Sequence, residues 1–71
     1  MWQIEPQWTI IEQGIIELKT THIRIIRDDS RAAPFVVTWK GQHQGVSGTL
    51  EMAKDFAMSL LDELLETGED P

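Results

Sequence analysis

The residues of this chain that are able to do acid–base or nucleophilic chemistry are few and scattered. They are His22 and His43, with Ser30, Ser47 and Ser59 as the serines. Hydrolases and transferases place a nucleophile beside a base, or hold paired carboxylates in a cleft. No spacing links either histidine to a serine, and 71 residues leave little volume for a pocket of about 300 Å³. We therefore expect a protein that is not an enzyme.

Metal and cofactor sites are equally unsupported by the residue pattern. The two histidines do not form a zinc signature, and the chain has no cysteine to supply a thiolate ligand. Asp28-Asp29 is more typical of a turn than of a cation site. The glycines at 41, 45 and 48 lack the lysine-serine or lysine-threonine pair that completes a phosphate-binding loop. We expect no metal and no cofactor.

Short runs of β-branched and aromatic residues fill the first two thirds of the chain and predict strands. The runs are 8–12, 15–19, 22–27, 35–39 and 42–47. Gln13-Gly14 and Lys40-Gly41 favour tight hairpin turns, and Gly45 indicates a bulge or an edge strand. Thr20-Thr21 fits either a turn or a bend within one long strand from Ile15 to Arg27. Residues 28–34 form a polar loop that ends in proline.

The C-terminal third predicts one amphipathic helix, from Leu50 to about Thr67. Thr49 stands at the N-cap position, and Gly68 is a natural stop. Apolar residues recur at spacings of three and four, which defines one face of a helix. This stripe consists of Ala53, Phe56, Ala57, Leu60, Leu61 and Leu64. Met52, Met58 and Leu65 flank it.

Together these elements predict an α+β fold. We expect a small antiparallel, meander-like sheet of about four strands, followed by one C-terminal helix that packs on one face. Residues 1–67 form the domain, and residues 68–71 form a flexible acidic tail. Alternation places three sets of residues on the face beneath the helix. These are Phe35, Val37 and Trp39, then Ile23 and Ile25, then Ile16 and Leu18. The tryptophans Trp2, Trp8 and Trp39 help to enlarge a thin core.

The net charge of −6 comes from the C-terminal part of the chain. Residues 1–40 contain five acids and five bases, whereas residues 41–71 contain seven acids and one base. An acidic surface of this kind keeps a chain soluble and repels phosphate groups. No apolar run approaches a membrane span, and Met1 to Pro6 show no basic leader. We expect a cytoplasmic protein without a membrane partner.

The sheet face that points away from the helix is the predicted partner-binding surface. Alternation places both cations and aliphatic residues on it. The candidate residues are Ile15, Lys19, His22, Arg24, Ile26, Val36, Thr38 and Lys40. A half-apolar sheet face on a small protein is typical of protein contact. The helix margin, with Met58 and Leu65, is a second candidate surface.

A basic sheet backed by a helix also suits nucleic acid. The segment from Phe35 to Leu61 is similar in rhythm to the strand–strand–helix ends of double-stranded-RNA-binding domains and of AP2-type DNA-binding domains. The similarity lies in Gly45-Val46-Ser47-Gly48 followed by an alanine-rich helix, and it implies a nucleic-acid partner. The RNA-binding pattern has a lysine cluster where this chain has Leu50-Glu51-Met52. We therefore assign no family.

Two functions remain after these exclusions. The first is a non-enzymatic protein-interaction module that associates with itself as a homodimer. A chain without disulfides or metal gains stability by burying more apolar surface than one copy provides. The alternative is a nucleic-acid-binding domain that uses the basic outer sheet face.

Overall fold

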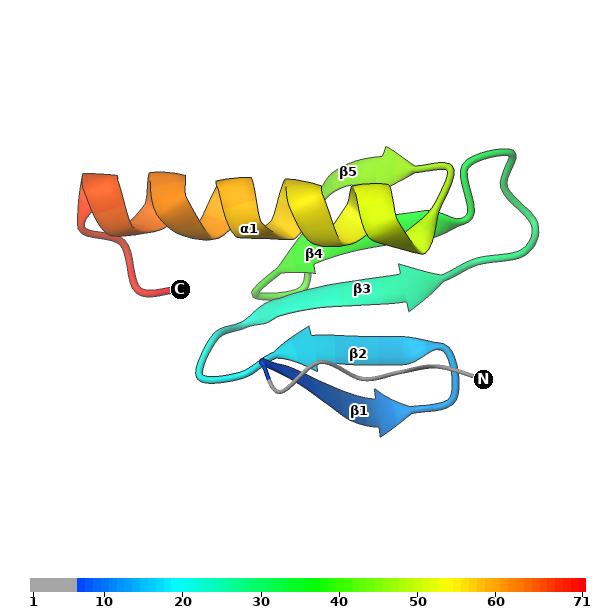
Figure 1. Cartoon of the computed structure of the whole chain (residues 1–71), viewed down its shortest axis with the longest axis horizontal. Helices are drawn as coiled ribbons and strands as arrows, with labels where there is room; N and C mark the ends of the chain where they lie inside the picture. The colour runs from blue at the N-terminus through cyan, green and yellow to red at the C-terminus, as the bar shows by residue number, and fades with distance from the viewer. Residues whose placement is uncertain (1–6) are drawn as a thin grey trace.

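The computed structural model describes residues 7–71, which form a five-stranded antiparallel sheet and one helix (Figure 1). The elements are β1 (Trp8–Glu12), β2 (Ile15–Leu18), β3 (Ile23–Arg27), β4 (Phe35–Trp39), β5 (Gln42–Ser47) and α1 (Leu50–Thr67). The strands lie side by side in chain order, as a meander. The predicted fold class and helix bounds are confirmed. The predictions for Trp2 and for the first six residues lie outside the described range.

The sheet has five strands, not about four, because Thr20-Thr21 is a turn. Thr20 takes a positive φ of 63°, which reverses the chain between β2 and β3. The Thr21 hydroxyl donates to the Leu18 carbonyl at 2.8 Å and accepts from the Ile23 N–H at 3.1 Å. A side chain therefore completes the hydrogen bonding of this tight connection. The sequence contained no glycine, asparagine or aspartate that would have indicated a turn there.

Helix α1 begins and ends as the sequence predicts. The Thr49 side chain accepts a hydrogen bond from the Met52 N–H at 3.1 Å, so it satisfies one of the free N–H groups of the first turn. Gly68 takes the left-handed conformation at φ 77°, and its N–H and that of Glu69 bond back to carbonyls of the last turn. Local chemistry thus sets both helix ends.

The core lies between α1 and one face of the sheet. Its buried residues are Trp8, Ile16, Leu18, Ile23, Ile25, Val37, Ala53, Ala57 and Leu64. The helix backbone approaches β3, β4 and β5, and β1 and β2 extend beyond its edge (Figure 1). Ala53 and Ala57 have no exposed surface, since their short side chains allow close approach to the sheet. The predicted floor of the core is confirmed.

Phe56 is the exception within the predicted helix stripe, because 39% of it remains exposed. Its ring lies against Gly45 of β5, where an added Cβ would stand 3.0 Å from the ring. The aromatic side chain therefore covers the edge strand and does not enter the core.

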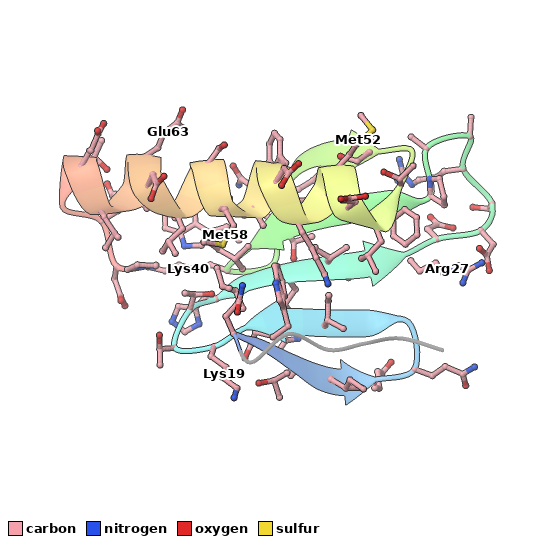
Figure 2. The ribbon with its side chains drawn as sticks, in the orientation of Figure 1. Lys19, Arg27, Lys40, Met52, Met58 and Glu63 are labelled. Atoms are coloured by element: carbon pink, nitrogen blue, oxygen red, sulfur yellow. The ribbon has the colours of Figure 1, made fainter. Side chains whose placement is uncertain are left out.

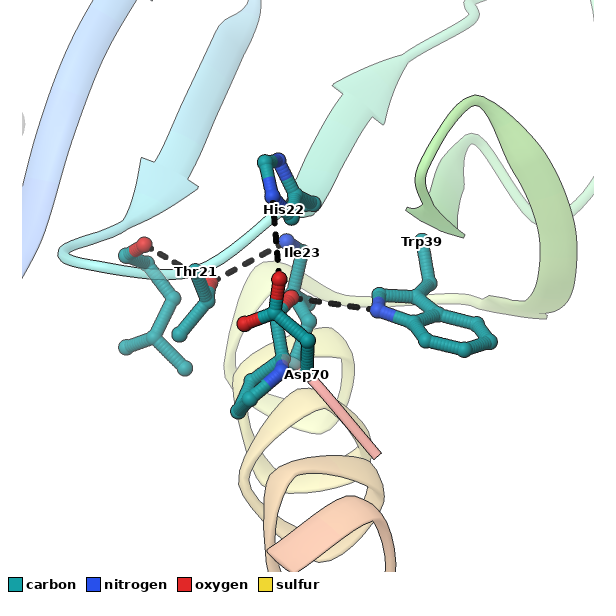
Figure 3. Close-up of polar contacts among 7 residues, drawn as sticks. Thr21, His22, Ile23, Trp39 and Asp70 are labelled. Atoms are coloured by element: carbon teal, nitrogen blue, oxygen red, sulfur yellow. Dashed lines mark hydrogen bonds and ion pairs between the residues drawn. The ribbon is translucent and has the colours of Figure 1, made fainter. Parts of the chain in front are cut away.

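The residues after the helix return to the end of the sheet (Figure 3). The Pro71 carbonyl accepts a hydrogen bond from the His22 N–H at 2.6 Å and another from Trp39 Nε1 at 3.1 Å. The carboxylate of Asp70 stands 4.0 Å from His22 Nε2. Flexibility of residues 68–71 stays a prediction, and in this structure the segment connects β3 and β4 to the helix end.

Candidate interaction surface

Both edge strands contain a β-bulge, and each bulge changes which side chains face outward. In β1 the register shifts between Ile10 and Glu12, so that Ile11 is the extra residue. In β5 the register shifts opposite Val37 and Thr38, where Gln44 is extra. Directly paired residues of antiparallel strands point to the same face. The two bulges therefore bring Glu12 and Val46 to the outer face, which is the face opposite α1.

One cross-strand row of residues runs across the whole outer face. Glu12 pairs with Ile15, Ile15 with Ile26, Ile26 with Val36, and Val36 with Val46. We call this set the outer row. It contributes one residue from each strand, and four of the five are aliphatic. The residues 7–71 include no second helix that covers this face.

A second, polar row lies beside the outer row. Thr9 pairs with Glu17, Glu17 with Arg24, Arg24 with Thr38, and Thr38 with His43. The Nε atom of Arg24 donates to the Glu17 carboxylate at 2.8 Å. This cross-strand ion pair uses one edge of the guanidinium, so the terminal amino groups of Arg24 remain able to donate.

A hollow of about 330 Å³ opens on the outer face over this polar row. It is lined by Glu17, His22, Arg24, Ile26, Thr38, Lys40 and Gly41. The Lys40 ammonium also lies 4.9 Å from the centre of the Trp39 ring, an attractive cation–π distance. The hollow is as large as the smallest ligand sites.

The structure brings together five of the eight predicted partner-binding residues around the hollow. These are His22, Arg24, Ile26, Thr38 and Lys40. Ile15 and Val36 join Ile26 in the outer row, and Lys19 stands apart from the hollow lining. Figure 2 shows Lys19 and Lys40 at the same end of the sheet and Arg27 at the other.

Exposure across the outer row is uneven. Val36 and Thr38 are buried, although both point outward from β4, because β4 lies between β3 and β5 and neighbouring side chains enclose them on both sides. Ile15 and Ile26 are half-buried, and Val46 on the edge strand is 44% exposed. The row therefore presents a flat apolar stripe whose accessible part lies mostly at Val46.

Glu12 and Val46 were missed as site residues by the sequence reasoning. Simple alternation from Trp8 places Glu12 on the helix side, and alternation from the Lys40-Gly41 turn places Val46 there too. The predicted bulge near Gly45 is confirmed, and it was the one signal that could have corrected Val46.

The remaining candidate residues of the sequence analysis are the histidines, the serines and the acids of the described chain. Among residues 7–71, Ser30 bonds to Asp28, His22 lies just before β3 and His43 lies on β5. No group of three or more potential metal ligands occurs among these residues. A second hollow, of about 380 Å³, is lined by Gln13, Gly14, Arg27 and Asp29.

Asp28 is the ionisable group whose environment changes its acidity. The Ser30 hydroxyl and backbone N–H donate to it at 2.6 and 3.1 Å, and Arg31 donates at 3.0 Å. These bonds, that of the Ser30 hydroxyl above all, lower the pKa of Asp28. The Asp28 carboxylate therefore holds the turn formed by Asp28, Ser30 and Arg31 in the loop before β4.

Comparisons with known proteins give no assignment. No protein-family model matches the chain, and no curated protein or solved structure matches it significantly. Within residues 7–71, no helix is long and apolar enough to cross a membrane. The function has to be inferred from the surface itself.

Proposed function

We propose that this protein is a non-enzymatic interaction module that pairs with a second copy of itself through the outer sheet face. The outer row carries the proposal, because it aligns Ile15, Ile26, Val36 and Val46 across four strands with no helix above them. The exposed side chain of Val46 and the exposed parts of Ile15 and Ile26 gain free energy when a second copy removes them from water. One self-complementary patch forms a closed symmetric dimer.

The distribution of charge favours this face over the helix margin. At the margin, Asp62 lies one turn from both Met58 and Leu65, so two copies that meet there bring acids together. On the outer face the cations Arg24 and Lys40 lie beside the outer row. A dimer through the outer faces separates the two acidic helices by both sheets, which exceeds the Debye length of about 8 Å.

The edge strands favour contact through the face over contact along the edge. A regular edge strand offers free N–H and C=O groups to a second chain. Here β1 and β5 each contain a bulge, and bulges disrupt the ladder that edge-to-edge pairing requires. Self-association by extension of the sheet is therefore disfavoured at both edges.

The size of the face sets the expected affinity. Four strands about 4.8 Å apart, with about five residues each at about 3.3 Å, span roughly 300 Å². Stable complexes bury at least about 1,200 Å² in total. Two such faces together bury roughly 600 Å², which is below that range, so we expect the dimer to be weak and reversible, with a Kd in the micromolar range or above.

Sedimentation equilibrium over a dilution series tests the proposal. Wild-type protein should approach twice its monomer mass of 8.1 kDa at high concentration. Val46→Lys should weaken the dimer at least tenfold, and because Val46 is 44% exposed the variant should still fold. Leu65→Lys, at a helix-margin residue that is 59% exposed, is the matched control. A wild-type monomer at every concentration, or a dimer that only Leu65→Lys dissociates, would refute the proposal.

Nucleic-acid binding remains the second candidate, because Arg24, Lys40 and His22 line one hollow. The two functions differ in their response to salt. Binding to DNA or RNA should weaken steeply as salt rises, because it releases counterions. Dimerisation should respond to salt much less steeply, because it releases no counterions from a polyanion and because salt also screens the mutual repulsion of chains with a net charge of −6. Arg24→Glu combined with Lys40→Glu should abolish retention on nucleic acid if this alternative is correct.

A further inference from the structure

The hollow on the outer face carries hydrogen-bond donors that the chain itself does not use fully. Arg24 donates its Nε to Glu17, which leaves its terminal amino groups. No carboxylate of residues 7–71 forms an ion pair with Lys40. Thr38 adds a hydroxyl to the lining. These groups are suited to an acceptor that carries negative charge.

The charge of the lining limits the size of that anion. Arg24 and Lys40 contribute two positive charges and Glu17 one negative charge, so these three groups leave one positive charge, while His22 in the same lining faces the Asp70 carboxylate at 4.0 Å. A single carboxylate balances this charge. A phosphate dianion exceeds it, and the net charge of −6 repels a polyanion at longer range. The lining therefore matches one acidic side chain.

One carboxylate on the same face has no partner within the described chain. Glu17 on the outer face is paired with Arg24, and the two acids of the loop after β3, Asp28 and Asp29, are paired with Arg31 and Arg27. Glu12 is exposed and forms no ion pair with any of the residues 7–71. The bulge at Ile11 is what places Glu12 at the β1 end of the outer row. An unused carboxylate and an unfilled hollow thus share one surface.

We infer that Glu12 of each copy occupies the hollow of the other copy in the dimer, between Arg24 and Lys40. This inference rests on the proposed function. In a two-fold interface residue i of one copy contacts residue j of the other, and j contacts i. Each dimer then contains two Glu12–hollow contacts, one on each side of the packed outer rows. The β1 bulge orients Glu12 toward the second copy, because it places this side chain on the outer face.

A double-mutant cycle on the dimer dissociation constant tests the contact. Glu12→Lys and Lys40→Glu should each weaken the dimer about tenfold or more, since each places like charges together. The combination of Glu12→Lys and Lys40→Glu should restore the dissociation constant to within about threefold of wild type. Asp55→Lys makes the same charge change on the exposed surface of α1, and it should leave the dimer intact or tighten it. Circular dichroism confirms that each variant is folded.

Three outcomes distinguish the Glu12 contact from the proposed dimerisation on which it depends. A monomeric wild-type protein overturns both. A dimer that Val46→Lys dissociates, but that Glu12→Lys leaves unchanged, overturns only the Glu12 contact. Single variants that weaken the dimer, with a combined variant that is weaker still, also overturn it, because the two charges then act separately.

Discussion

Two neighbouring threonines in the β2–β3 turn differ in backbone conformation and in burial. Thr20 is exposed and takes a positive φ of 63°, a conformation that is strained for a β-branched residue. Thr21 is buried, and its hydroxyl bridges Leu18 and Ile23. The turn therefore depends on the second threonine and tolerates the first.

Replacement of each threonine should change the free energy of unfolding in opposite directions. Thr20→Asn should raise it by about 0.5–1 kcal/mol, because asparagine accepts the left-handed conformation more readily. Thr21→Val should lower it by about 1–2 kcal/mol, because the buried Ile23 N–H loses its acceptor. Urea denaturation followed by tryptophan fluorescence measures both. Equal changes at the two positions would contradict this assignment.

The Asp28 loop has a defined response to acid. Hydrogen bonds from Ser30 and Arg31 lower the pKa of Asp28 in the folded protein. Its contribution to stability is therefore complete above the pKa of the unfolded chain, and it is lost as the pH falls through the lower folded value. Ser30→Ala should raise the pKa of Asp28 toward its ordinary value, as measured by NMR titration of the carboxyl carbon. The remote variant Lys54→Gln serves as the control, and an unchanged titration in Ser30→Ala would disprove the role of the hydroxyl.

At the scale of elements, helix α1 is part of the core and not an appendage. Leu64 is 7% exposed in the cluster that includes Ile23, Ile25 and Val37. Its neighbour Leu65 is 59% exposed. Replacement of each leucine by alanine therefore distinguishes the contribution of core packing to stability from that of helix propensity.

Leu64→Ala should lower the free energy of unfolding by about 2–4 kcal/mol, because it leaves a cavity beneath the helix. Leu65→Ala should change it by less than about 0.5 kcal/mol, as is usual for exposed positions. Thermal unfolding followed by circular dichroism compares the two variants. Similar values at both positions would mean that the helix does not pack as described.

The helix was predictable because each of its signals is local. The N-cap, the apolar stripe and the C-terminal glycine all act on residues within one or two helical turns of themselves. The strands were predictable for the same local reason. Their registers were not, because the extra residues Ile11 and Gln44 belong to bulges, which depend on pairing with a second strand. That is why the sequence identified Arg24 and Lys40 as surface cations but did not place Glu12 and Val46 beside them.

At the scale of the whole molecule, the chain separates its functions between two sides of one sheet. The inner side holds the core and the acidic helix, and the outer side holds the outer row and the hollow. Burial of the inner side explains the stability of the fold. The residues of the outer side are not part of that core. We propose that they bind a second copy of the chain.

The central claim is that two copies meet through the outer face, and methyl NMR over a concentration series tests it most directly. With the isoleucine, valine, leucine and methionine methyl groups labelled, dilution should shift the signals of Ile15, Ile26, Val36 and Val46. The signals of Met52, Met58 and Leu65 should stay constant, because the helix lies on the far side of the dimer. Shifts confined to those helix residues, or no shifts at millimolar concentration, would contradict the account.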